Sequence, residues 1–186
     1  MIGVRAGVVA LSLTVALGSA SGAGATSDEP LYDLIDAASQ RLLTADPVAA
    51  TKWLNGGPIT DPARVQQVLD AVSADARAVQ LPTEYVTHQF TAQIDATEAI
   101  QYSRFSWWKL DPAAAPTSSP DLSASRGLID GFNRRMVSEI AEQWPVLRSP
   151  ACPVRLAAAK AVVADERRLD PLYRQALDTA TRSYCS

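Results

Sequence analysis

The chain has 186 residues, of which 47% are hydrophobic, and a formal net charge of -3 at pH 7. This length suits one domain that buries a sizeable core, so we expect a single domain. A nucleic-acid-binding protein would show a dominant basic face, which this mildly acidic composition does not provide. We therefore expect no nucleic-acid partner.

The first 25 residues have the pattern of a secretory signal peptide. A short positive start, residues 1–5, precedes an apolar run, residues 6–17, and a small-residue segment that ends in Ala23-Gly24-Ala25. An A-x-A ending of this kind marks a cleavage site. The apolar run is shorter than the roughly 20 residues needed to cross a bilayer, and no later stretch is longer, so no membrane anchor is expected. We expect residues 26–186 to form the mature domain, secreted or periplasmic.

Apolar residues recur at helical spacing in the first half of the mature chain, and turn signals separate three helices. Ser27 and Asp28 precede the first helix. Asp46-Pro47 interrupts it, which predicts a kink or a restart capped by Asp46, and residues 55–58 end it. The second helix starts at Asp61-Pro62 and stops at residues 81–82, and the third runs from residue 83 towards Trp107.

The second half predicts a loop over residues 110–121 and three further helices. The first of these starts at Asp121 and ends near residues 144–145. The other two cover residues 153–168 and, after Asp170-Pro171, residues 172–184. No period-two alternation is present, so the predicted fold class is all-α, a single-domain helical bundle of about six helices.

The chain contains two cysteines, Cys152 and Cys185. An exported chain meets an oxidising compartment, so we predict one structural disulfide between them. A redox or metal site fits poorly, because the spacing is wrong and His88, expected at the surface, is the only histidine. We expect no metal.

Five polar residues fall on otherwise apolar helix faces: Arg41, Lys52, Arg64, Gln101 and Arg126. A buried cation needs a compensating partner, so four converging cations imply a bound anion. Arg41 and Lys52 are eleven residues apart, which puts them on one face if the helix between them is only kinked.

Alternative interpretations of these residues remain. The cations can belong to core ion pairs with Asp36, Asp61, Asp95 or Glu98, and Gln101 can make an interhelical hydrogen bond. The pair Trp107-Trp108, with Tyr102 and Phe105 nearby, predicts a packing cluster at a helix end.

The usual catalytic motifs are not apparent. With one histidine there is no persuasive Ser-His-Asp set or histidine-rich metal site, and we find no glycine-rich phosphate loop. An enzyme built on this chain would act by positioning and electrostatics, without a cofactor.

Residues 37–53, 93–106 and 121–126, together with the joint spacing of the polar residues, resemble the secreted gamma class of AroQ-type all-helical chorismate mutases. The resemblance covers essentially the whole mature chain, including both cysteines. It implies conversion of chorismate to prephenate by a Claisen-type rearrangement, in the phenylalanine and tyrosine branch of aromatic amino-acid biosynthesis. It also implies a homodimer in which each chain builds a complete site.

The resemblance further implies roles for individual residues. Arg41, Arg64 and Arg126 would hold the carboxylates, and Lys52 and Gln101 would donate to the ether oxygen. Thr97 and Asp61 would line the site and orient the ring hydroxyl and the cations.

Two positions depart from close relatives, which carry glutamate at Gln101 and glutamine at Val68. A valine at position 68 cannot make the polar contact of a glutamine, which puts the affinity for the substrate in question. An alternative function is therefore a secreted helical binding protein, or an inactive mutase-like module, that binds a small carboxylate without transforming it.

Overall fold

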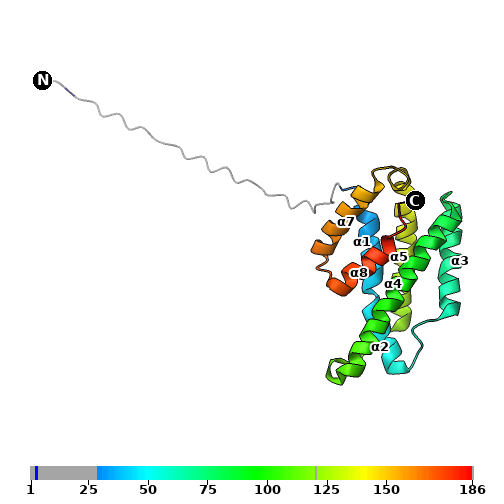
Figure 1. Ribbon diagram of the computed structural model, residues 1–186, viewed down its shortest axis with the longest axis vertical. Coiled ribbons are helices and arrows are strands. Elements are labelled where there is room, and N and C mark those ends of the chain that lie inside the picture. The colour runs from blue at the N-terminus through cyan, green and yellow to red at the C-terminus, as the bar shows by residue number, and fades with distance from the viewer. Residues whose placement is uncertain (1–2, 4–28, 120, 186) are drawn as a thin grey trace.

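The computed structural model describes Gly3, residues 29–119 and residues 121–185, and the latter two ranges form a helical bundle (Figure 1). No strand occurs in this part of the chain, so the all-α prediction is confirmed. The main helices are α1 (Tyr32–Leu43), α2 (Ala45–Asn55), α3 (Pro62–Ala78), α4 (Thr83–Leu110), α5 (Leu122–Glu142), α7 (Cys152–Glu166) and α8 (Pro171–Thr181). Two short elements, η1 (Pro112–Ala114) and α6 (Trp144–Leu147), complete the order. The predicted signal peptide and the predicted helix start at Ser27 and Asp28 lie outside the described residues.

The long helix α4 is the centre of the bundle. It packs against α8, α3 and α2, and α1 packs against α5, α7 and α8. In Figure 1, α7 and α3 lie at opposite sides of the bundle, and α2 lies at its lower end. The core between the helices contains Leu34 of α1, Phe90 and Ile100 of α4, and Ile140 of α5, all with no exposed surface.

Three helices start at the aspartates that the sequence indicated. Asp61, Asp121 and Asp170 accept hydrogen bonds from the backbone N–H of Arg64, Ser123 and Tyr173, at 3.1, 3.0 and 2.9 Å. An aspartate cap satisfies an amide that has no partner within the helix, and its charge suits the positive end of the helix dipole. These caps fix where α3, α5 and α8 begin.

The predicted break at Asp46-Pro47 is a restart, but Asp46 is not its cap. Thr44 precedes the first residue of α2, and its side chain donates back to the Arg41 carbonyl at 2.6 Å. Asp46 lies inside α2 and accepts two hydrogen bonds from Arg104 of α4, at 2.7 and 3.0 Å. Asp46 therefore makes a long-range ion pair instead of the helix cap that the local sequence predicted.

Aromatic residues pack where α2 meets the end of α4, but the set differs from the predicted one. Trp53 makes edge-to-face contacts with Phe105 and Trp108, with ring centroids 5.2 and 5.6 Å apart. Trp107 and Tyr102 are instead more than half exposed.

His88 is exposed, as predicted. None of the described helices is both long and apolar enough to span a membrane.

The disulfide predicted from the sequence is present between Cys152 and Cys185. It ties the start of α7 to the segment that follows α8, and α4 binds the same segment. The Tyr85 hydroxyl donates to the Tyr184 carbonyl at 2.7 Å, and the Gln89 amide donates to the Ser183 carbonyl at 2.9 Å. The end of the chain is thereby fixed against the central helix.

Replacing both cysteines by alanine should destabilise the protein. The disulfide spans 33 residues of sequence, and closing such a loop removes unfolded-state entropy worth about 3.8 kcal/mol. Urea unfolding of the variant and the parent measures the difference, with the parent in a reducing agent as a second comparison. A loss below about 1 kcal/mol would show that the packing around Tyr184 suffices without the disulfide.

Candidate active site

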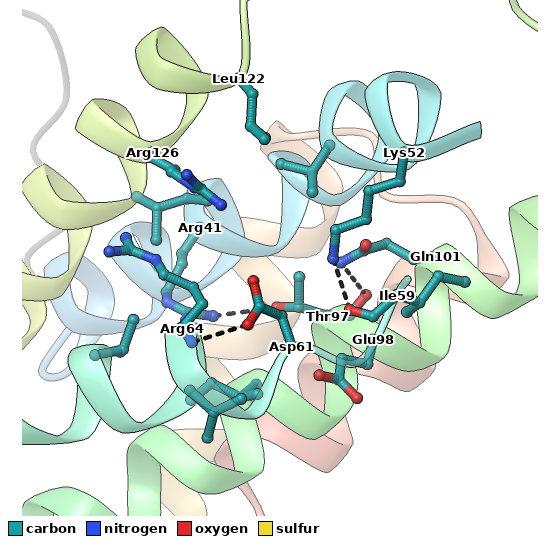
Figure 2. Close-up of a pocket in the computed structure, with 15 residues that line it drawn as sticks. Arg41, Lys52, Ile59, Asp61, Arg64, Thr97, Glu98, Gln101, Leu122 and Arg126 are labelled. Atoms are coloured by element: carbon teal, nitrogen blue, oxygen red, sulfur yellow. Dashed lines mark hydrogen bonds between the residues drawn. The ribbon is translucent and has the colours of Figure 1, made fainter. Parts of the chain in front are cut away.

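One pocket brings together all eight residues proposed from the sequence: Arg41, Lys52, Asp61, Arg64, Val68, Thr97, Gln101 and Arg126. Their side chains come from α1 to α5 and the connection before α3, and they face a common space (Figure 2). The empty space of the pocket, counted together with its part open to solvent, is about 610 Å³. Apolar walls come from Val48, Ile59, Val65, Val68, Ile94, Leu122 and Ile129.

Arg41 is the most deeply buried cation of the pocket, with 4% of its surface exposed. Its Nε donates to Asn133 Oδ1 at 2.8 Å, and its Nη1 donates to the Thr97 hydroxyl at 3.1 Å and the Gln93 carbonyl at 3.3 Å. Burial lowers the pKa of Arg41 to about 10, so the group remains a cation at neutral pH. No ion pair within the described residues includes it. Its direct hydrogen-bond partners are therefore all neutral oxygens.

Lys52 lies in the last turn of α2, and the turn after this helix provides its partner. Gly56 adopts a positive φ of 73°, which glycine accommodates without strain, and it ends the helix. The chain then returns so that the Ile59 carbonyl accepts from Lys52 Nζ at 2.6 Å. Burial lowers the pKa of Lys52, and the nearby carboxylates of Glu98 and Asp61 oppose that effect. Two of its three N–H donors remain for a ligand.

Arg64 pairs with a carboxylate of this chain, but the pair is partly exposed and does not lie in the core. Its Nη2 lies 2.6 Å from Asp130 Oδ1 of α5. The expected acids do not include Asp130. Among them, Asp61 caps α3 through the Arg64 backbone N–H, and Asp36 pairs with Arg167 at 2.7 Å. The ion pair fixes the Arg64 guanidinium between α3 and α5.

Gln101 and Thr97 lie one helical turn apart on α4. The Thr97 hydroxyl donates to the Gln93 carbonyl at 2.7 Å and accepts from Arg41. Gln101 is 4% exposed, and its amide donates only weakly, at 3.4 Å, to the Thr97 carbonyl in the same helix. Its buried Oε1 has no partner within the described part of the chain. The predicted interhelical hydrogen bond is absent there, so the Gln101 amide is available to a ligand.

Arg126 enters the pocket from the first turns of α5, beside Leu122 and Ile129. It is exposed and makes no hydrogen bond or ion pair with a described residue. Figure 2 shows Arg126, Arg41 and Arg64 on one side of the pocket and Lys52 with Gln101 on the other. The pocket thus has two polar groups of residues separated by an open space.

The charges that line the pocket favour an anion with more than one negative group. Four cations face two carboxylates, Asp61 and Glu98, and only Arg64 is in contact with an acid. A cation without an acidic partner in a partly buried site gains most from a ligand that supplies the missing charge. No cluster of three potential metal ligands occurs in the described ranges. The arrangement suits a small dicarboxylate.

Sequence comparisons agree with this geometry. The sequence profile of the family described as "Chorismate mutase type II" matches residues 32–102, which include most of the pocket. A protein of Mycolicibacterium smegmatis named "Secreted chorismate mutase" is 55% identical over 177 residues, covering 92% of this chain and 98% of that protein. The chain belongs to the type II chorismate mutase family.

Another family member, named "Secreted chorismate mutase" in Mycobacterium tuberculosis, is 50% identical and covers 95% of this chain and 88% of its own length. The crystal structure of chorismate mutase from Burkholderia thailandensis superposes with a TM-score of 0.80 at 33% identity. It covers 85% of this chain and all of that chain. The type II chorismate mutase fold therefore extends over nearly all of the described residues.

Glu98 and the apolar wall residues other than Val68 were not among the predicted site residues of this chorismate mutase family member. The Glu98 carboxylate lines the pocket and accepts from the Thr60 hydroxyl at 2.7 Å. Its position between Thr97 and Gln101 was a usable signal, because residues three apart on a helix share a face. On the same principle, Leu122 and Ile129 flank Arg126 at helical spacing.

The two roles of Asp61, a helix cap and a pocket charge, can be separated by substitution. Asp61→Ala should lower the free energy of unfolding by about 1 kcal/mol, because α3 loses its side-chain cap. Asp61→Asn should leave stability nearly unchanged, because asparagine caps about as well as aspartate. Urea unfolding of both variants provides the measurement. Equal losses in the two would mean that the charge of Asp61, rather than the cap, stabilises the fold.

Proposed function

We propose that this protein is a chorismate mutase that converts chorismate to prephenate. Family membership indicates the class of reaction, and one observation of the pocket supports the same activity in this protein. Four cations and the Gln101 amide face one pocket, and three of those cations have no carboxylate in contact within the described residues. Chorismate is a small dicarboxylate, so it supplies the charges that the pocket lacks.

The three arginines would hold the two carboxylates and fold the enolpyruvyl arm over the ring. Arg126 offers its whole guanidinium fork, which suits bidentate binding of a carboxylate. Arg41 offers a single nitrogen, because Nε and both N–H groups of Nη1 are already donated to Asn133, Thr97 and Gln93. Its Nη2 remains for the substrate.

Lys52 and Gln101 would donate to the ether oxygen of chorismate. In the rearrangement the C–O bond breaks as a C–C bond forms, and negative charge grows on that oxygen. Donors fixed in advance at such a position stabilise the transition state more than the substrate. The free N–H groups of Lys52 and Gln101 lie on the side of the pocket opposite the arginines (Figure 2).

The reaction needs no nucleophile and no cofactor, because it is unimolecular. A rate enhancement on the order of 10⁶ asks for about 8 kcal/mol of transition-state stabilisation. Holding the reactive conformer and placing two donors at the ether oxygen can supply that amount.

We also propose that residues 1–25 are a signal peptide and residues 26–186 the exported enzyme. The residue pattern described above supports this division, and so do the two relatives named as secreted proteins. The branch of metabolism would be phenylalanine and tyrosine biosynthesis.

The family resemblance supports a homodimer as the working form. All eight proposed site residues line one pocket within a single chain, so the proposed roles need no residue from a second subunit. Sedimentation of the mature protein would determine the assembly.

Loss of chorismate, followed by ultraviolet absorbance, tests the activity. Lys52→Ala should lower kcat by about 10² or more, because a donor to the developing charge is removed. Arg126→Ala should act mainly by raising KM, because the carboxylate that it binds is charged throughout the reaction. Lys109→Ala is a matched control, since Lys109 is exposed at the end of α4 and outside the pocket.

Turnover that survives both Lys52→Ala and Arg41→Ala would refute the proposed site. A parent protein that binds chorismate without converting it would favour the alternative, a carboxylate-binding module. In that case Val68, an apolar residue buried in the pocket wall, is the first position to exchange for glutamine.

The rate should be nearly independent of pH between about pH 5 and 8. An amide such as Gln101 donates at any pH in this range, and neither proposed donor is a carboxyl group that must first gain a proton. Because burial lowers the pKa of Lys52, kcat should fall on the alkaline side before an ordinary lysine would lose its proton. A pH profile of kcat measures both features, and a steep loss between pH 6 and 8 would contradict this assignment.

Gln101→Glu is the matched variant for that profile. A glutamate donates a hydrogen bond only when protonated, so the kcat of this variant should decrease as the pH rises through the carboxyl pKa. Parallel profiles for the variant and the parent would show that residue 101 is not a donor in the reaction.

A further inference from the structure

Arg41, the most buried arginine of the pocket, has a different kind of side-chain partner from three other arginines that reach a residue distant in sequence. Arg64 pairs with Asp130, Arg104 with Asp46, and Arg167 with Asp36, all at 2.6–2.7 Å. Arg41 is more buried than these three, yet the side chain at its Nε is the amide of Asn133. An aspartate at position 133 has nearly the same shape and would complete an ion pair.

Asn133 is itself buried, with 4% of its surface exposed, and it lies on α5 one turn after Asp130. Its Oδ1 accepts from Arg41 Nε at 2.8 Å across the interface of α1 and α5. The Thr97 hydroxyl and the Gln93 carbonyl of α4 hold Nη1. Three neutral oxygens from two helices thus fix the guanidinium plane and leave only Nη2 without a partner in the described residues.

From this arrangement we infer that Asn133 is a positioning residue that orients Arg41 without neutralising it. The inference rests on the proposed function and deepens it. A neutral acceptor keeps the full positive charge for a substrate carboxylate, whereas an aspartate would satisfy the charge inside the protein. The identity of residue 133 therefore sets the affinity of this site for the dianion.

Asn133→Asp tests the inference, with Ser138→Asp as the control. Ser138 is exposed on the same helix, so its replacement adds the same charge away from the pocket. Asn133→Asp should raise KM for chorismate about tenfold or more, because a charged hydrogen bond to the substrate is weakened. Its kcat should stay close to that of the parent, because the carboxylates carry the same charge in substrate and transition state. Its thermal midpoint should be equal or higher.

A purely structural role for Asn133 predicts a different result. The thermal midpoint would then change while KM stayed within about twofold of the Ser138→Asp control, and that result would overturn the inference. If the parent binds chorismate but does not convert it, calorimetric titration replaces the assay. The proposed function would then fail, and weaker binding by Asn133→Asp would still support the role of Asn133.

Asn133→Ala provides a second test that does not require an aspartate to be tolerated in the core. If Asn133 acts only through Arg41, this change should lower kcat/KM in the parent and have no further effect in an Arg41→Ala background. Equal fold-losses in the two backgrounds would show that Asn133 acts independently of Arg41 and would overturn the inference.

Discussion

The hydrogen bonds around the Arg41 guanidinium are the interaction on which the pocket depends. They join α1, which carries Arg41, to Thr97 and Gln93 of α4 and to Asn133 of α5. Hydrogen bonds to neutral oxygens offset only part of the desolvation free energy of a buried cation. A bound carboxylate would offset the remaining cost, which agrees with the proposed role of Arg41 in substrate binding.

The rest of the fold keeps α4 in place, because this helix contributes Thr97, Gln101 and the Gln93 carbonyl to the site. The helix α8 and the segment around Tyr184 pack against it. The disulfide at Cys185 and the hydrogen bonds from Tyr85 and Gln89 hold that segment. Precise placement of donors requires such support, since a shift of about 1 Å at a reacting group can cost a large factor in rate. The disulfide and these hydrogen bonds therefore contribute to the geometry of the pocket, although none of their residues lines it.

Local sequence predicted the helices and the pocket cations because both follow from short-range rules. The caps at Asp61, Asp121 and Asp170 lie only two or three residues from the amides they bind, and cations on apolar faces are visible from helical spacing. Partners distant in sequence were not predictable in this way. Asp130 is 66 residues from Arg64, and Asn133 is 92 residues from Arg41. The aromatic cluster was misassigned for a similar reason, because its third member, Trp53, comes from another helix.

The distribution of charge also explains why a neutral residue at position 101 is compatible with the proposed chemistry. Lys52 is fixed by the Ile59 carbonyl, and Gln101 has a buried amide without a strong internal partner. A unimolecular rearrangement transfers no proton to or from the enzyme, so its donors need not be acids with tuned pKa values. They need only to point at the oxygen on which charge develops. An amide and an ammonium group would provide this without a carboxyl group that must be protonated.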